Sequence, residues 1–302
     1  MELRQLKYFV TVAKTLNFSE ASRKLFITQG TLSQQIMQLE DELGIQLFSR
    51  TSHSVILTEA GEELLPLALE TLEASNVCKD KMRDLQNALS GTLSIGVTHS
   101  FSVFLADTVK NFLKMHPGVK LHIHYKTASE LIEMLKRKEV DFILAFKPIM
   151  EYDEIEAEVL FRSRLSVVMR KDHPLATKKF VSFSDIEKQG IVLPASGLQA
   201  RKMFENFVGV DTRRLDVRIE LNDPNMIMDI VQGTNLVAMV SSLAAYYRTS
   251  LVAVPLEEGG HEMLGCVQRL KDGYRKRSAE VFLDMLRDAA QVERICRGMP
   301  VK

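Results

Sequence analysis

The sequence predicts an N-terminal winged helix-turn-helix, then a long linker helix, then a C-terminal α/β domain. Two short amphipathic helices separated by a tight turn occupy residues 19–43. A single apolar stripe continues through residues 59–88, which is the pattern of one long helix. Beyond residue 91, strand and helix patterns alternate, as they do in parallel α/β sheets.

Composition is that of an ordinary globular protein. The 302 residues are 46% hydrophobic and 26% charged, which allows one to three domains. No apolar run approaches the length of a membrane span and the charged N-terminus does not resemble a signal peptide, so we expect a cytoplasmic protein with no membrane partner. Cys78, Cys266 and Cys296 are far apart without metal-ligand spacing, and a reduced state is the simplest interpretation.

Charge argues against indiscriminate nucleic-acid binding. The 39 basic and 39 acidic residues give a net charge of zero. Within residues 1–58, six basic side chains oppose five acidic ones. Because so small a positive charge gives weak non-specific affinity, we expect two or more copies to bind one DNA.

The first two helices are predicted from periodicity and capping. Apolar side chains recur at helical spacing over residues 3–15. Ser19 is expected to cap a second helix that ends at Leu25, because serine is a favoured N-cap. The small Ala21 on its inner face would let two helix backbones approach closely.

Thr28 is expected to cap a third helix that runs from Gln29 to Leu43 and ends at Gly44. Its core-facing stripe comprises Leu32, Ile36, Leu39 and Leu43. At about 100° per residue, the opposite face centres on Gly30 and Gln34. The flanks of that face are Ser33 with Met37 and Thr31 with Gln38.

This opposite face is typical of a recognition helix. Its N-terminal half is small, polar and uncharged, whereas Glu40, Asp41 and Glu42 make the C-terminal half acidic. Such a helix would enter the major groove N-terminus first, where glutamine can pair with adenine and Ser or Thr can contact bases or phosphates. The alternative is a solvated helix face that happens to contain many glutamines, and on this helix alone the two interpretations are balanced.

A wing follows the third helix. Leu47 and Phe48 are expected to be a buried anchor, residues 50–54 form a polar turn, and residues 55–57 return as a strand. Arg50 could reach a phosphate or a narrow minor groove. A surface ion pair is the alternative role for Arg50, and we rank it lower because no other basic residue lies between Lys24 and Lys79.

The linker helix is expected to start after Thr58, which caps it, with acidic residues in the first turns where the helix dipole favours them. About 30 residues of helix would span about 45 Å. Because one side is apolar, the helix needs a partner. It could pair with a second copy, or it could fold back onto its own C-terminal domain.

The C-terminal pattern divides into two sets of strands and helices. Residues 90–92 break the linker helix. The first set has strands at 93–98, 119–125 and 140–146 with helices at 104–115 and 129–137; the second has strands at 164–170, 191–194, 218–221, 236–240 and 263–270 with helices at 198–207, 224–232 and 277–296.

Polar residues at the strand ends are the candidates for a ligand site. They are Thr98, His99, Ser100, Ser129, Ser196 and Asn222. Hydroxyls and backbone N–H groups at converging helix N-termini suit a carboxylate or another anion. For any single residue, plain helix capping explains the side chain equally well. No cofactor and no metal site is predicted.

Enzyme motifs are absent from the sequence. There is no Gly-x-Ser-x-Gly elbow, no His-Glu-x-x-His and no phosphate-binding loop. We therefore expect a protein that is not an enzyme.

Three segments resemble one known family. LRQLKYFVTVAKTLNFSEASRKL, TQGTLSQQIMQLEDELGIQLFSR and LTEAGEELLPLA closely resemble the DNA-binding domain of LysR-type transcriptional regulators, nearly without gaps over residues 1–70. The family usually has proline where Gly30 stands and a small alanine-like residue where Thr31 stands, so the preferred operator is expected to differ from the family norm. The DNA-binding candidates are Ser19, Thr28, Gln29, Gly30, Thr31, Ser33, Gln34, Arg50 and His53.

The resemblance also implies a domain organisation. Residues 1–58 would be the winged helix-turn-helix, 59–90 the linker and dimerisation helix, and 91–302 a two-lobed α/β effector-binding domain like periplasmic binding proteins. Lobe 1 would comprise about 91–161 and 266–302, and lobe 2 about 162–265, with crossovers near Phe161 and Gly265.

The function implied is a transcriptional regulator whose binding to an inverted-repeat operator is modulated by a small-molecule effector. Its partners would be double-stranded DNA, a second copy in a homodimer or a dimer of dimers, the effector, and RNA polymerase as a further option. The alternative is a ligand-binding receptor module whose helical head mediates protein contacts rather than DNA binding.

Overall fold

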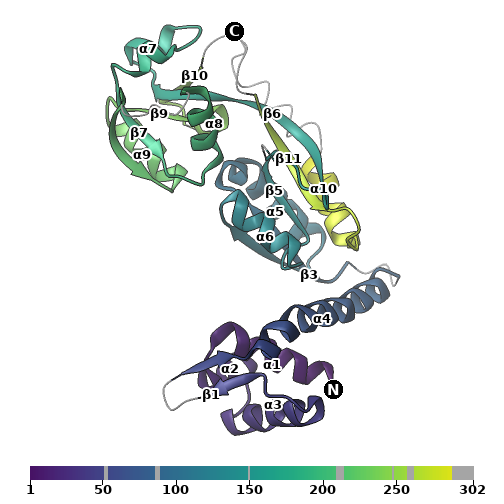
Figure 1. The fold of residues 1–302 in the computed structure, drawn as a ribbon. Helices are drawn as coiled ribbons and strands as arrows, with labels where there is room; N and C mark the ends of the chain where they lie inside the picture. The colour runs from purple at the N-terminus through teal and green to yellow at the C-terminus, as the bar shows by residue number, and fades with distance from the viewer. Residues whose placement is uncertain are drawn as a thin grey trace. The chain divides into compact units, whose positions relative to one another are not determined.

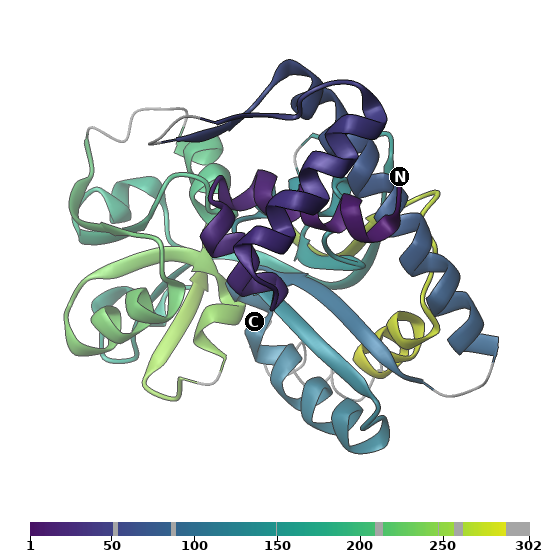
Figure 2. The same ribbon diagram turned by 90° about the horizontal axis from the view of Figure 1, so that it is seen from below.

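The computed structural model describes residues 1–50, 54–85, 89–148, 150–208, 214–246, 248–256 and 262–287. The chain divides into two compact units, Met1–Gln86 and Asn87–Lys302. Most of their helices and strands are labelled in Figure 1, and Figure 2 shows the same ribbon from below. No helix in these described ranges is long and apolar enough to cross a membrane.

The N-terminal unit is a winged helix-turn-helix followed by a long helix, which confirms the predicted fold of this part. Its elements are α1 (Leu3–Thr15), α2 (Phe18–Leu25), α3 (Gln29–Leu43), the antiparallel strands β1 (Phe48–Arg50) and β2 (Val55–Leu57), and α4 (Glu59–Leu85). Phe9, Leu32, Ile36 and Phe48 form the centre of one buried cluster. Apolar residues of α4, including Leu65 and Leu69, pack against the same cluster.

Helix capping in this unit differs from the prediction at one place. Asn17, and not Ser19, caps α2: its side chain accepts a hydrogen bond from the Glu20 N–H at 2.9 Å. Leu16 ends α1 in the left-handed conformation (φ 49°), so the chain turns early and Phe18 becomes the first, buried residue of α2. The predicted cap of α3, Thr28, is confirmed, because its hydroxyl oxygen accepts a hydrogen bond from the Thr31 N–H at 3.1 Å.

The predicted apolar stripe of α3 is correct except at its end. Leu32, Ile36 and Leu39 are fully buried, whereas Leu43 is 40% exposed. Leu43 lies in the final turn, beside the C-cap Gly44, where the helix leaves the buried cluster. The predicted cap of the linker helix is confirmed, because Thr58 Oγ1 accepts from the Gly61 N–H at 3.1 Å.

The C-terminal unit is built on one nine-stranded sheet with the strand order β4-β3-β5-β11-β6-β9-β7-β8, and β10 pairs with β6. The strands are β3 (Gly91–Val97), β4 (Val119–Tyr125), β5 (Phe142–Phe146), β6 (Ile155–Arg170), β7 (Gly190–Pro194), β8 (Asp216–Leu221), β9 (Val237–Ser241), β10 (Leu251–Pro255) and β11 (Glu262–Leu270). The helices are α5 (Ser102–Met115), α6 (Ala128–Lys136), α7 (Phe183–Ile186), α8 (Gln199–Val208), α9 (Pro224–Gly233) and α10 (Arg277–Arg287), with 3-10 turns η1 (His99–Phe101), η2 (Pro174–Thr177) and η4 (Ser242–Ala245).

Two lobes share this sheet. In lobe 1 the parallel strands β4, β3 and β5 alternate with α5 and α6; in lobe 2 the parallel strands β8, β7 and β9 alternate with α8 and α9. β6 joins them, because it pairs with β11 over residues 155–164 and with β9 and β10 over residues 165–170. β6 and β11 run side by side in Figure 1. The two-lobed α/β fold is therefore confirmed.

The crossover between lobes is tightly packed. Gly265 is the register partner of Phe161, and the register of β11 shifts directly after it. A Cβ on Gly265 would lie 2.2 Å from the Phe161 ring, so any larger residue there would have to displace the ring. The Phe161 ring packs against Phe101 and Phe146 at centroid distances of 5.1 and 6.1 Å.

Several element boundaries in this unit differ from the prediction. β3 starts at Gly91 (φ 99°), inside the predicted break, and α5 starts at Ser102, two residues early. α7 and β10 were not predicted, because α7 is a single turn and β10 pairs only with the distant β6. Cys296 and the predicted end of the last helix lie outside the described residues, since the described part of α10 ends at Arg287.

Candidate nucleic-acid interface and effector site

The predicted DNA-facing side of α3 is open. Gln29, Gly30, Thr31 and Gln34 are exposed, and Ser33 is half-buried on the flank. The hydroxyls of Thr28 and Thr31 lie 2.8 Å apart, and the Thr28 hydroxyl also holds the first turn through the Thr31 N–H. The N-terminal half of α3 therefore presents small polar groups and amides with no charged side chain among them. We call these five residues of α3 the reading face.

Ser19 lies at the edge of the reading face although it does not cap its helix. Its hydroxyl donates to the Gln29 side-chain oxygen at 2.8 Å. The first turn of α2 is thereby tied to the first side chain of α3. The fold brings Ser19, Thr28 and the reading face together on one side of the helix-turn-helix.

In the acidic half of α3, Glu40 has partners that the sequence analysis did not foresee. Its side chain is only 11% exposed. Its carboxylate accepts from the Leu47 and Phe48 N–H groups at 2.9 and 3.2 Å, and from Arg50 Nη2 at 3.0 Å. Sequence reasoning missed this contact because the partners lie seven to ten residues along the chain.

Arg50 is ion-paired with Glu40 in this structure, which is the alternative role, and its contact with DNA stays a prediction. Besides the Glu40 carboxylate, its guanidinium lies 4.6 Å from the centre of the Phe18 ring. Arg50 ends β1 at the root of the wing. His53, another predicted DNA contact, lies outside the described residues.

In lobe 1, the effector candidates lie at the carboxyl ends of neighbouring strands. Thr98 follows β3, and its N–H and hydroxyl both donate to the Leu144 carbonyl, at 2.9 and 3.3 Å. The His99 ring stacks on Tyr125, at the end of β4, with centroids 5.1 Å apart. Ser100 lies in the short turn η1 between β3 and α5 and is half-buried. Burial raises the pKa of the Tyr125 hydroxyl, so the phenol stays protonated at neutral pH.

Ser129 lies in the first turn of α6, but it does not cap the helix. Thr127 is the cap: it accepts from the Glu130 N–H, and Glu130 reaches back to the Thr127 N–H at 2.9 Å. This capping box leaves Ser129 exposed. The Glu130 side chain, with its pKa lowered by the hydrogen bonds from Thr127, places a carboxylate next to the proposed anion site.

In lobe 2, Ser196 follows β7 and Asn222 follows β8, and both side chains are exposed. The two strands are neighbours, so these residues share one edge. Gln199, at the start of α8, donates to the Lys147 carbonyl, just beyond β5, at 2.6 Å. The structure therefore gathers the candidates into one group per lobe, and one hydrogen bond joins the two strand-end edges. No pattern in the sequence indicated that Gln199 and Lys147 would meet.

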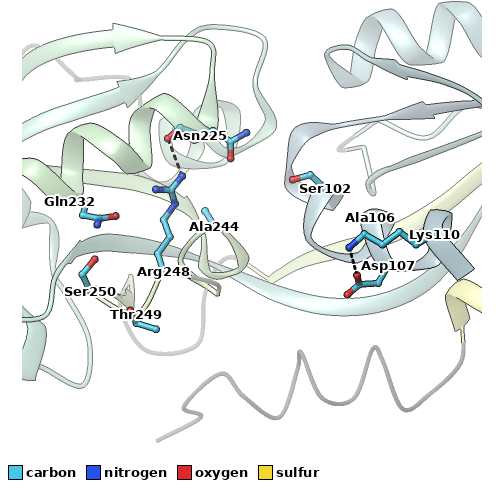
Figure 3. A pocket seen from close by; sticks show the side chains of 10 residues that line it. All are labelled: Ser102, Ala106, Asp107, Lys110, Asn225, Gln232, Ala244, Arg248, Thr249 and Ser250. Atoms are coloured by element: carbon cyan, nitrogen blue, oxygen red, sulfur yellow. Dashed lines mark hydrogen bonds and ion pairs between the residues drawn. The ribbon is translucent and has the colours of Figure 1, made fainter.

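A groove of about 760 Å³ lies elsewhere on this unit, between α5 and lobe 2. Figure 3 shows its two walls: Ser102, Ala106, Asp107 and Lys110 on α5, and Asn225, Gln232, Ala244, Arg248, Thr249 and Ser250 opposite. None of the six predicted effector residues lines it. Its cations are already paired, Lys110 with Asp107 at 3.1 Å and Arg248 with Asp229. An anion there would have to displace these carboxylates.

No metal centre is apparent in the part of the chain that the structure describes. Its His, Cys, Asp and Glu side chains form no group of three that could hold an ion. Cys78 is exposed on α4 and Cys266 is buried in β11, where burial raises the pKa of the thiol. That shift disfavours the reactive thiolate at Cys266.

Both units match known families. Residues 3–62 match the bacterial regulatory helix-turn-helix protein, lysR family, and residues 86–291 match the LysR substrate binding domain. The chain is 30% identical over 207 residues, 68% of each protein, to the RuBisCO operon transcriptional regulator of Allochromatium vinosum.

Solved structures share the fold. A full-length OxyR variant from Pseudomonas aeruginosa superposes with a TM-score of 0.72 at 22% identity, covering 97% of both chains. Full-length CbnR, in a complex described as containing its target DNA, gives a TM-score of 0.64 at 20% identity, covering 98% of this chain and 100% of that one.

Proposed function

This chain belongs to the LysR family of transcriptional regulators, and from that premise we propose that two copies read an inverted-repeat operator through the N-terminal half of α3. The observation that carries the proposal is the reading face itself. Its five residues, all between positions 29 and 34, present hydroxyls, side-chain amides and a glycine, and no charged side chain lies among them.

Each reading-face residue has a chemical role in this proposal. Gln29 and Gln34 would pair with adenine edges, and Thr31 and Ser33 would contact bases or phosphates. Gly30 keeps a backbone N–H that proline would lack, and it leaves room for the DNA because only the Thr28 hydroxyl lies within 4 Å of a Cβ built there. Ser19, Thr28 and His53 would contact the flanking backbone.

Pairing of two heads is supported by the apolar surface of α4. Leu67 and Met82 are 59% and 57% exposed on this helix. A second copy would bury them, and a two-fold dimer would set two reading faces about one DNA turn, or a multiple of it, apart. A dimer of dimers and contact with RNA polymerase at the promoter extend the same proposal.

The effector is proposed to be a carboxylate or other small anion held at the strand-end edges of the C-terminal unit. Hydroxyls of Ser100, Ser129 and Ser196 and the N-termini of α6 and α8 would supply donors there. The Thr98 hydroxyl would join them by exchanging the Leu144 carbonyl for the anion. Effector binding would change how the two heads are spaced. A coupling of about 1–3 kcal/mol is enough for a useful switch. The regulator itself would need no cofactor and carry out no catalysis.

Fluorescence anisotropy tests the DNA proposal. Full-length protein is titrated into labelled DNA from upstream of its own gene, and into scrambled DNA of equal length, at several salt concentrations. We expect tighter binding to the upstream DNA and a loss of affinity with salt. Binding that is neither selective nor salt-sensitive would favour the alternative, a receptor module whose head contacts protein.

A thermal-shift screen of small metabolites on the full-length protein tests the effector proposal. A ligand present at about 100 times its dissociation constant stabilises its target by about 2.7 kcal/mol. Carboxylates and other anions should dominate the hits. Hits confined to uncharged or cationic compounds would contradict the anion site.

A further inference from the structure

Glu40 connects the recognition helix to the wing. One carboxylate oxygen accepts from two successive backbone amides, Leu47 at 2.9 Å and Phe48 at 3.2 Å, and the other accepts from Arg50 at 3.0 Å. The donors are the first residues of the wing and the last residue of its first strand. A single side chain of α3 thus fixes the position of that whole strand.

The same two peptide groups, Gln46–Leu47 and Leu47–Phe48, are held through their carbonyls by Thr58, which caps the linker helix. The Leu47 carbonyl accepts from the Thr58 N–H at 3.0 Å, and the Gln46 carbonyl accepts from the Thr58 hydroxyl at 2.7 Å. A Cβ on Gly61 would lie 2.2 Å from the Leu47 oxygen, so the first turn of α4 packs directly on the Leu47–Phe48 peptide. Glu40 therefore holds the N–H groups, and Thr58 the carbonyl groups, of the same two successive peptides.

Arg50 is held in place by two contacts that a phosphate would have to disrupt. Its guanidinium lies between the Glu40 carboxylate and the face of Phe18, which is 7% exposed in the core. If Arg50 turned to DNA, Glu40 would lose its cation while lying mostly buried close to a polyanion. An unpaired buried carboxylate is costly, and the phosphates would raise the cost.

We propose that Glu40 is a positioning residue that couples the recognition helix to the wing and to α4, and that Arg50 acts through Glu40 rather than on phosphate. This proposal rests on the proposed DNA-reading function. Because α4 carries the pairing surface, the Glu40 contacts are the route by which the spacing of two heads sets the angle of each reading face.

Four single variants and one double variant of the full-length protein test it by anisotropy on the upstream DNA at several salt concentrations. Arg50→Lys keeps the charge but loses the planar fork, and Arg50→Met removes the charge. Glu40→Gln keeps the shape, but its amide presents an oxygen on one side only, so one set of donors loses its acceptor. Asp41→Asn is the matched control, since it removes one charge from the neighbouring, exposed position of the same helix.

If the proposal holds, Glu40→Gln, Arg50→Lys and Arg50→Met each weaken specific binding by about tenfold or more, with the wild-type salt slope. The Glu40→Gln/Arg50→Met double variant is no weaker than its single variants, because both remove one unit. Asp41→Asn binds as the wild type. If Arg50 contacted a phosphate instead, the DNA affinity of Arg50→Lys would stay near that of the wild type. The salt dependence of binding by Arg50→Met would then fall by about one charge, and this result would overturn the proposal.

Amide hydrogen exchange on the DNA-free protein separates failure of this proposal from failure of the DNA-reading function. The Leu47 and Phe48 amides should exchange about tenfold faster in Glu40→Leu, which removes both carboxylate oxygens, than in Asp41→Asn. Equal exchange in the two variants would overturn the Glu40 coupling whether or not the protein binds DNA. If neither the wild type nor any variant binds DNA selectively, the proposed DNA-reading function is wrong. The exchange rates still test the coupling through Glu40 in that case.

Discussion

The two units hold their candidate residues together by different means. In the N-terminal unit, Ser19, Thr28 and the reading face all lie within residues 19–34, and hydrogen bonds between residues close in the sequence join them. In the C-terminal unit the candidates are split between two lobes. The hydrogen bond that joins the strand-end edges of the two lobes connects Gln199 to Lys147, which are 52 residues apart in the sequence. One site is determined by local sequence, the other by sheet topology.

This difference suggests how each unit can change. A reading face built on one helix can alter its base preference by substitution at Gly30 or Thr31 without disturbing the core, because both side-chain positions are exposed. A site built from two lobes responds to any change in the crossover between them. The following substitutions test that contrast, in order of decreasing effect.

Matched glycine substitutions should have the largest effect. Gly61→Ala places a Cβ 2.2 Å from a backbone oxygen that cannot move, and should lower the free energy of unfolding of the N-terminal unit by about 3 kcal/mol. Gly265→Ala meets the Phe161 ring, which can adjust, and should cost the C-terminal unit about 2 kcal/mol. Chemical denaturation of the full-length protein measures both.

Gly233→Ala is the control for these variants. No atom lies within 4 Å of its Cβ and the residue ends α9, so stability should change by no more than about 0.5 kcal/mol. If Gly61→Ala were as stable as this control, the close packing of α4 on the wing would be wrong.

The reading face gives the next largest effect. Gln34→Ala and Ser33→Ala should each weaken binding to the operator by about 1–3 kcal/mol if the side chain contacts a base, with little change on random DNA. Gln38→Ala is the matched control, because Gln38 is also exposed on α3 but lies one turn further from its N-terminus. Unchanged discrimination between operator and random DNA would remove the residue from the base-reading set.

A comparison inside the C-terminal unit distinguishes its two candidate ligand sites. Ser129→Ala and Ser196→Ala should each weaken binding of an effector found by thermal shift by about 1 kcal/mol, the loss of one hydrogen bond. Thr249→Val, in the wall of the groove between α5 and lobe 2, should have no effect. Isothermal titration measures all three, and the reverse pattern would place the effector in the groove.

The smallest effect is a pH-dependent one far from either site. The pKa of Asp185 is lowered from 3.8 to about 2 by the Lys178 ammonium and by the Ser182 N–H and hydroxyl. A lowered pKa means that folding favours the carboxylate, so this stabilisation is present above about pH 4 and is lost as the pH falls to about 2.

Asp185→Asn should therefore lower the free energy of unfolding by about 1 kcal/mol at pH 7, where solvent screens part of the ion pair. Near pH 2 the variant and the wild type should unfold at the same denaturant concentration. A difference that persists at that pH would show that the carboxylate charge is not its source.

Local rules predicted most of the N-terminal unit. The bounds of α3, its Thr28 cap and the Thr58 cap of α4 follow from residues within one helical turn of each other. The misplaced Ser19 cap shows where such rules fail: Asn17 and Ser19 are both good caps, and the burial of Phe18 decided between them. The strand and helix alternation of the C-terminal unit was equally readable, but β10 was missed because its only partner is a distant strand.

By itself, the sequence determined the winged helix-turn-helix, the polar face of α3, the long helix and the two sets of α/β elements, because each is a periodic pattern that neighbouring residues impose. The tertiary structure alone decided which groups Glu40 and Arg50 contact. Their charges are as visible in the sequence as those of Asp41 and Lys24, yet the burial of Phe18 and Phe48 brings them together and turns a wing cation into the partner of a recognition-helix acid. Charge is a property of the residue, whereas its partner is set by the packing of the chain around it.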